Sequence, residues 1–224
     1  MNNLIISISY LLLSFILTII AYKYFGKIGL ITWMCILLII SNIQTMKVSN
    51  ILGFSVSLGN ISYGGTFLAT DLLNEKYGKK VTKQAILLSF LIMIMFCLSM
   101  SLFLEFEPSE LDVTQNSLLT IFHYLPRITI TSLIAYFISQ HCDAFLYDTI
   151  RQKTKVLWIK NYISTVVSQI LDTMIFTLGA FLGVLSFANI VEIAITMLIF
   201  KIIIALLDIP FMYFATGLKV RELS

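Results

Sequence analysis

The stretch "NNLIISISYLLLSFILTIIAY", residues 2–22, contains no charged side chain. An α-helix rises 1.5 Å per residue, so a run of this length crosses the roughly 30 Å hydrocarbon core of a bilayer. The run lacks the basic start and small-residue cleavage site of a signal peptide, so we interpret it as a membrane span. In the whole chain 58% of residues are hydrophobic and 12% are charged, about half the charged share of soluble domains. The sequence therefore predicts an all-α polytopic membrane protein.

The apolar runs predict seven membrane crossings, at residues 4–22, 30–49, 54–75, 85–104, 127–148, 160–184 and 189–216. Lys and Arg concentrate after the first, third, fifth and seventh runs, whereas the longest of the other connections, "EFEPSELDVTQNS" at 105–117, is acidic. Basic connections stay in the cytoplasm. We therefore expect a multi-pass protein of the inner or plasma membrane, with its N-terminus outside and its C-terminus cytoplasmic.

The third run, "GFSVSLGNISYGGTFLATDLLNE" at 53–75, is interrupted by glycines, among them the pair Gly64-Gly65. Glycine is a poor helix former, so we expect a broken span whose continuous helix starts near Gly65. Non-helical backbone at membrane depth survives where protein buries it or a cavity hydrates it, and carriers often build substrate sites there. Asp71 follows this break. It either lines such a cavity or closes the cytoplasmic end of the span.

Two charged residues, Asp172 and Lys201, lie near the middle of their apolar runs. A central charge costs roughly 2.5–3.5 kcal/mol on insertion, whereas an apolar residue returns only about 0.3–0.6 kcal/mol. Both side chains should therefore face the bundle interior or a water-filled cavity. Asn161, Ser164 and Ser168 share the helical face of Asp172. These groups either hold the helices together or line a ligand cavity, and the number of uncharged donors and acceptors favours the cavity.

Other classes of protein find little support in the sequence. The three cysteines lie inside apolar runs and form no CxxC pair, so no disulfide framework is predicted. No phosphate-binding loop, metal-ligand cluster or nucleophile–base motif occurs, so we expect no cofactor, no metal and no enzyme activity. The "GAFLG" segment at 179–183 is a GxxxG face, which packs helices within one chain or between the subunits of a homo-oligomer. Packing within the chain is the favoured interpretation.

The chain becomes recognisable in four blocks, "FLATDLLNEKYG" at 67–78, "RITITSLIAYFISQHCDAFLYDTIRQ" at 127–152, "STVVSQILDTMIFTLGAF" at 164–181 and "EIAITMLIFKIIIALLDIPFMYF" at 192–214. They resemble the signature blocks of the queuosine precursor transporter family, also called the "putative vitamin uptake transporter" family. The resemblance runs from about Ile31 to the end and implies a six-helix transporter core at 30–224. Residues 1–29 are then an extra N-terminal transmembrane helix with a short basic loop. The resemblance also implies import of 7-deazaguanine bases, the cyano and aminomethyl precursors or queuine, for tRNA modification.

A deazaguanine presents a ring N–H and an exocyclic amine side by side, which one carboxylate accepts as a bidentate pair. Its carbonyl needs a donor, and its flat face suits an aromatic ring. The candidate groups are Asp172 or Glu192 as the carboxylate, Gln169 and Asn42 as the amides, and Tyr136 or Phe176 as the ring. The resemblance separately implies functional positions at Asn42, Asp71, Arg127, Asp172, Glu192 and Lys201.

Two transport mechanisms remain open. A secondary carrier would need only the lipid bilayer and its purine-like small-molecule substrate, with Asp71, Glu192 or Lys201 available for proton coupling. The alternative is the substrate-binding subunit of an energy-coupling-factor importer, which would require ATPase partners. Neither mechanism involves a nucleic-acid partner.

Overall fold

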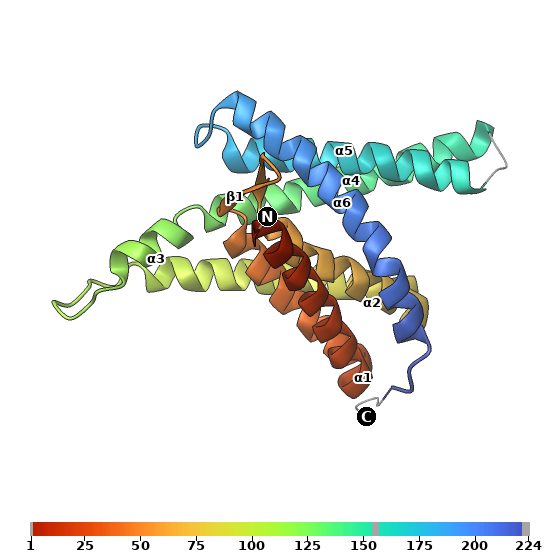
Figure 1. Cartoon of the computed structure of the whole chain (residues 1–224), viewed down its shortest axis with the longest axis horizontal. Coiled ribbons are helices and arrows are strands. Elements are labelled where there is room, and N and C mark those ends of the chain that lie inside the picture. Colours follow the sequence, from red (N-terminus) through yellow and green to blue (C-terminus); the bar gives the residue numbers. More distant parts are fainter. Residues whose placement is uncertain (1, 154–156, 221–224) are drawn as a thin grey trace. The chain divides into compact units, whose positions relative to one another are not determined.

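The computed structural model describes residues 2–153 and 157–220 (Figure 1). In chain order its elements are α1 (Asn2–Gln44), β1 (Val48–Ile51), β2 (Phe54–Ser57), α2 (Gly59–Phe103), α3 (Gln115–Phe122), α4 (Leu125–Lys153), α5 (Leu157–Phe181) and α6 (Phe187–Thr216). Within the described residues, four helical segments are long and apolar enough to cross a membrane: Asn2–Gln44, Gly59–Phe103, Gln115–Ser139 and Phe187–Thr216. The predicted α-helical membrane class is confirmed.

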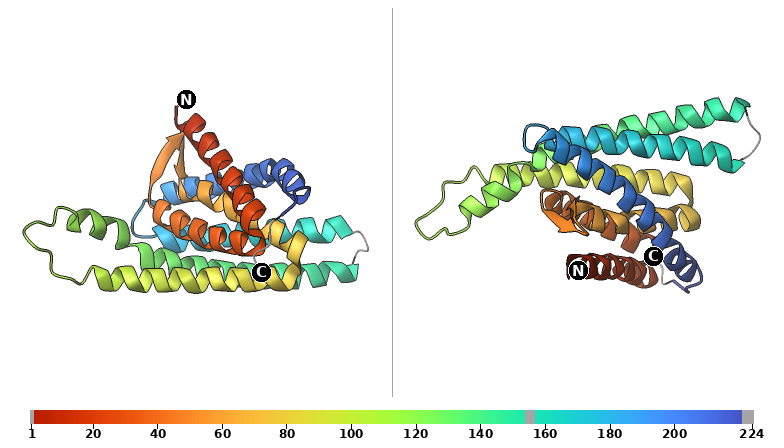
Figure 2. Two further views of the ribbon diagram at one scale, coloured as in Figure 1. Left: turned by 90° about the horizontal axis from the view of Figure 1, so that it is seen from below. Right: turned by 45° about the horizontal axis from the view of Figure 1, so that its top comes forward.

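Helix α1 bends back on itself at Gly26. Its 43 residues would form a straight rod of about 65 Å, twice the thickness of a hydrocarbon core. Gly26 has φ 53° and ψ −132°, a conformation that only glycine adopts readily. The indole Nε1 of Trp33 donates to Thr18 Oγ1 at 3.0 Å, and Nε2 of Gln44 donates to the Tyr10 hydroxyl at 3.1 Å. Both pairs straddle Gly26 almost evenly, so the arms 2–25 and 27–44 run antiparallel (Figure 2).

Helix α2 has the same kind of break at Gly78, where φ is 83° and ψ is 163°. It is helical from Gly59 through Gly64 and Gly65, so the predicted break near Gly65 is wrong. The reason is close packing: a Cβ added to Gly65 would lie 2.1 Å from the Ser14 hydroxyl oxygen. The glycines serve the approach of α1 to α2, and this tertiary packing overrides their poor helix propensity.

A β-hairpin precedes α2, where the sequence predicted the start of a membrane span. Strands β1 and β2 pair antiparallel, with Val48 opposite Ser57 and Ile51 opposite Phe54. The two turn residues, Leu52 and Gly53, have φ values of 54° and 90°, as a tight two-residue hairpin turn requires. The predicted third run, 54–75, is therefore strand at first and helix only from Gly59.

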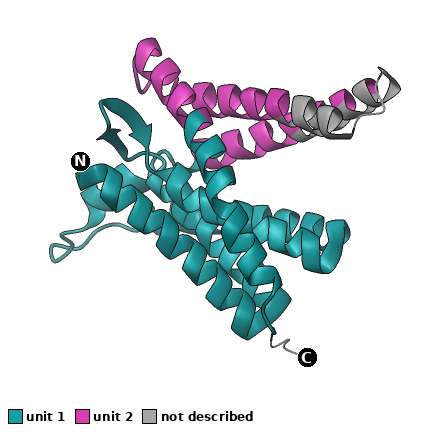
Figure 3. Ribbon diagram, turned by 45° about the vertical axis from the view of Figure 1, so that its right-hand side comes forward, with its two compact units in different colours: residues 1–126, 199–224 teal, residues 127–198 magenta. Residues whose placement is uncertain are grey.

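The chain divides into two compact units (Figure 3). Unit 1 comprises the chain up to Pro126 together with the part from Ile199 onward, and unit 2 comprises Arg127–Leu198. The core of unit 1 contains the fully buried side chains of Phe15, Leu30, Leu68 and Leu72. Since Phe15 belongs to the first arm of α1, the N-terminal helix is an integral part of this unit.

Candidate functional site

Unit 2 is built on an antiparallel pair of helices, α4 and α5. Three contacts define the register of this hairpin. Arg127 bonds to the carbonyl of Gly179, a Cβ added to Gly179 would lie 2.3 Å from the Thr131 side chain, and Ser139 bonds to Asp172. From Thr131 to Ser139 the chain advances eight residues along α4, and from Gly179 to Asp172 it goes back seven residues along α5, so the two helices are antiparallel. Gly179 thus packs helices within the chain, as the GxxxG segment predicted.

The carboxylate of Asp172 faces α4. Ser139 Oγ donates to Asp172 Oδ1 at 3.4 Å. Gln169 and Phe176 lie one turn to either side of Asp172 on α5, and Tyr136 lies one turn before Ser139 on α4. All four predicted side chains are half-buried. The hairpin therefore places the Asp172 carboxylate with an amide about one turn before it and an aromatic ring about one turn after it on α5, and opposite the turn of α4 that carries Tyr136 and Ser139. The side chains of Asn161 and Ser164, predicted on the same face, lie outside the described residues.

Arg127 binds the end of the neighbouring helix. Its Nε donates to the backbone oxygen of Gly179 at 2.6 Å, and Nη2 donates to the backbone oxygen of Leu182. The last carbonyls of a helix have no partner within the helix, and they carry the negative end of its dipole. In this structure the guanidinium therefore caps α5. Glu192, the remaining predicted residue of unit 2, is half-buried in the second turn of α6.

Unit 1 contains the other predicted residues, Asn42, Asp71 and Lys201. Asn42 is buried on the second arm of α1, and its Nδ2 donates to the Leu38 carbonyl at 2.8 Å. Lys201 is buried on α6, with 9% of its surface exposed. Asp71 is exposed on the first arm of α2, whereas Asp208 of α6 is buried, with 5% of its surface exposed. Asp208 lies seven residues after Lys201 on α6 and was not among the site residues predicted from the sequence.

A polar cluster of unit 1 was missed by the sequence reasoning. The Tyr10 hydroxyl, the Gln44 amide and the Ser62 hydroxyl are mutually hydrogen-bonded, with Tyr10 Oη 3.1 Å from Ser62 Oγ. Next to it, Ser41 Oγ donates to the Gly59 carbonyl at 2.9 Å. The available signal was the polar segment "SLGN" at 57–60, which lies within the glycine-interrupted stretch that predicted a broken helix. These bonds attach both arms of α1 to the start of α2.

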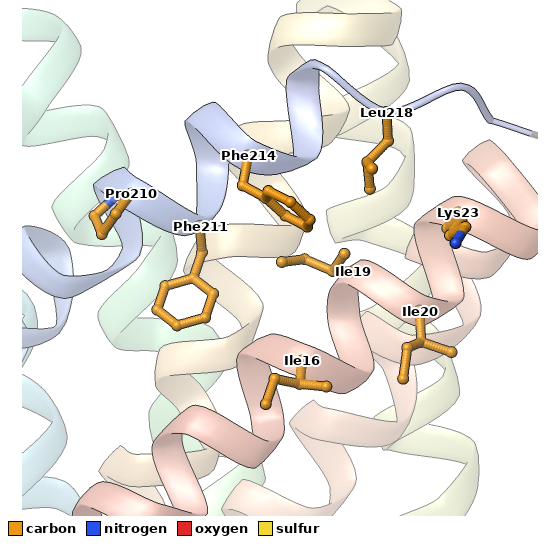
Figure 4. A pocket seen from close by; sticks show the side chains of 8 residues that line it. All are labelled: Ile16, Ile19, Ile20, Lys23, Pro210, Phe211, Phe214 and Leu218. Carbon is orange, nitrogen blue, oxygen red and sulfur yellow. The ribbon is translucent and has the colours of Figure 1, made fainter.

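Two apolar grooves, neither of them lined by any of the nine predicted residues, lie on unit 1. One of about 420 Å³ runs between α1 and α6 and contains Lys23 (Figure 4). The other, of about 400 Å³, lies along both arms of α1 and includes Trp33. Their walls are mainly Ile, Leu and Phe side chains, which suit lipid chains better than a polar base. Within the described part of the chain, no three His, Cys, Asp or Glu side chains gather as a metal site would require.

Comparisons with known proteins agree with this arrangement of apolar helices carrying polar groups. Residues 57–215 match the family model described as "Putative vitamin uptake transporter". The chain is also 38% identical over 211 residues to a protein of Bacillus subtilis (strain 168) described as "Probable queuosine precursor transporter". That similarity covers 93% of this chain and 92% of the relative. No solved structure matches the chain.

The helices and these similarities define a multi-pass membrane transporter, a protein of transport rather than catalysis. More particularly, the chain belongs to the family described as "Putative vitamin uptake transporter", and its Bacillus subtilis relative is the one described as "Probable queuosine precursor transporter".

Proposed function

We propose that this protein imports 7-deazaguanine bases, such as the cyano and aminomethyl precursors of queuosine or queuine, as a secondary carrier. One observation carries the proposal: the similarity to the Bacillus subtilis protein extends over 93% of the chain. It therefore includes most of both units rather than a single shared segment.

The α4–α5 hairpin supports a purine-like substrate. The Asp172 carboxylate accepts the ring N–H and the exocyclic amine of the base as a bidentate pair. Gln169 pairs with the base carbonyl, and Tyr136 or Phe176 covers the flat face. Glu192 contributes a second, half-buried carboxylate of unit 2 to this proposal, and the buried Asn42 and Lys201 are proposed functional positions of unit 1.

The proposed topology has seven crossings, a six-helix core and one additional N-terminal helix. The kinks at Gly26 and Gly78 support it, because each converts one long helix into two arms of membrane-spanning length. The hairpin at Val48–Ser57 connects two of these crossings. With basic connections in the cytoplasm, the N-terminus lies outside and the C-terminus inside.

The test uses the purified chain in proteoliposomes without ATPase partners and follows uptake of the labelled cyano precursor. The wild-type protein should transport it. Asp172→Asn and Glu192→Gln should abolish uptake, because each replaces an acceptor carboxylate with an amide. Asp112→Asn is the matched control, since Asp112 is an exposed loop carboxylate bonded only to its own turn among the described residues.

Three results would contradict the proposal in different ways. Normal uptake by both carboxylate variants would remove the carboxylate from substrate recognition. Tight binding without uptake would favour the substrate-binding subunit of an energy-coupling-factor importer. A chemically altered base after incubation would indicate an enzyme.

A further inference from the structure

Unit 1 contains two aspartates on helix segments that run side by side in the same direction. The first arm of α2 and the second half of α6 are held together at two levels. A Cβ added to Gly64 would lie 2.9 Å from Ile204, and the Lys76 ammonium donates to the Thr216 carbonyl at 2.8 Å. Twelve residues separate the two contacts on each helix, so the segments are parallel and stay in register.

This register sets the relative heights of Asp71 and Asp208. Asp71 is level with Phe211, and Asp208 is level with Leu68. The two aspartates are thus offset by three residues, or about 4.5 Å along the helix axes. Asp71 follows Gly64 by seven residues and Asp208 follows Ile204 by four, so each aspartate lies on the helix face that carries this contact.

The two carboxylates differ in their access to the surroundings. Asp208 is 5% exposed, and its carboxylate accepts no hydrogen bond from any described residue. Asp71 is exposed. A buried carboxylate without a hydrogen-bond donor is costly when ionised, and a second carboxylate nearby raises that cost. A bound proton removes the charge of Asp208, and the accessible Asp71 provides a way for that proton to arrive and leave.

Among the residues that the structure describes, no positively charged side chain pairs with Asp208 in place of the proton. On α6 itself, Lys201 lies two turns away, about 10 Å along the axis. On α2, Glu75 lies one turn beyond Asp71, and the neighbouring Lys76 is bonded to Thr216. On α1, the buried Tyr22 belongs to the core of unit 1. The next residue, Lys23, lies in the groove that Phe211 and Phe214 of α6 also line.

The turn that carries Asp208 is also a weak point of α6. Pro210 has no amide hydrogen, so the carbonyl of Leu206 lacks its helical partner. Helices bend at such positions. A change of charge at Asp208 therefore occurs beside a position at which α6 can bend.

We propose that Asp71 and Asp208 form the proton-binding site that couples base import to proton entry. The inference rests on the proposed function and specifies its driving force. One proton binds the pair from outside, neutralises Asp208 while α6 rearranges with the loaded base, and leaves to the cytoplasm through Asp71. No covalent bond forms or breaks, and the cycle moves one proton inward with each base.

The test compares uptake of the labelled cyano precursor into proteoliposomes with and without an acid-outside pH gradient, at a clamped membrane potential. The wild-type protein should accumulate the base several-fold above equilibrium, and a protonophore should abolish the excess. Asp208→Asn, which mimics the neutral acid, should exchange external for internal base but reach only equilibrium. Asp208→Glu should retain part of the accumulation, and Asp112→Asn should retain all of it.

A second measurement does not depend on transport. Infrared difference spectra between acidic and alkaline buffer should contain the carbonyl band of a protonated carboxylic acid, and Asp208→Asn should lose it. Gradient-driven accumulation by Asp208→Asn, or the same band in its spectrum, would overturn the inference. Wild-type uptake that always stops at equilibrium would also overturn it while leaving base import intact. A wild-type protein that moves no base at all would instead refute the proposed function.

Discussion

The Nε atom of Arg127, at the start of α4, lies 2.6 Å from the backbone oxygen of Gly179 near the end of α5. The sequence resemblance implied a functional position for this arginine, and the structure provides a physical reason that needs no ligand. Its guanidinium binds carbonyls at the end of α5. Arg127 thereby fixes the helix that carries Asp172, so we expect it to position the site rather than to contact the base.

Replacing Arg127 should therefore lower the stability of the fold, and should affect base binding only through that loss. Hydrogen bonds from a charged group contribute about 1.5–3 kcal/mol, so Arg127→Ala should lower the unfolding temperature in detergent clearly. Arg127→Lys should have an intermediate effect, because an ammonium does not reproduce the two-pronged guanidinium. Lys80→Ala, at an exposed position, is the control. Unchanged thermal unfolding together with lost base binding would place Arg127 on the ligand instead.

The contact between Gly65 and Ser14 provides a test of the packing of α1 on α2. A Cβ at position 65 would lie 2.1 Å from Ser14 Oγ, so Gly65→Ala should cost about 1–3 kcal/mol through overpacking. Ser14 Oγ is buried and has no hydrogen-bond partner among the described residues. Ser14→Ala alone should thus be neutral or stabilising. The double variant should recover most of the loss in thermal unfolding, whereas additive losses would show that this contact is not the cause.

The kink in α2 depends on the backbone of Gly78. Its φ of 83° and ψ of 163° lie in a region that is essentially restricted to glycine. A Cβ there would meet no atom within 4 Å, so the cost of Gly78→Ala is conformational and of the order of 1–3 kcal/mol. Gly217→Ala, where the nearest atom would be 3.6 Å away, is the matched control. Equal unfolding temperatures for the two variants would show that the kink needs no glycine.

The elements with uniform apolar composition were the most predictable part of the fold. The sequence predicted the last span at 189–216, and α6 occupies Phe187–Thr216. The glycines were harder to interpret, because a glycine breaks a helix, closes a turn or permits close packing according to its neighbours in space. Gly65 packs against Ser14 inside a regular helix. The breaks in α1 and α2 lie instead at Gly26 and Gly78, where the sequence predicted none.

The candidate site was likewise predictable only in part: its residues could be selected from the sequence, but their partners on the neighbouring helix could not. The chemical types of Gln169, Asp172 and Phe176 were enough to select them from the sequence, and all three lie on α5. The partner of Asp172 across the hairpin, Ser139, and the partner of Arg127, Gly179, lie 33 and 52 residues away in sequence. Such pairings depend on the register of two helices, and a single sequence does not encode that register as a local pattern.

In the proposed function, the Asp172 carboxylate recognises a 7-deazaguanine by accepting hydrogen bonds from its ring N–H and exocyclic amine. The most direct measurement is the dissociation constant of the purified protein for 7-deazaguanine and for 7-deazahypoxanthine, which lacks the exocyclic amine, in the wild type and in Asp172→Asn. The wild type should prefer 7-deazaguanine by about 10- to 100-fold, as expected for one hydrogen bond to a charged group, and Asp172→Asn should lose that preference. An undiminished preference in Asp172→Asn would contradict the account.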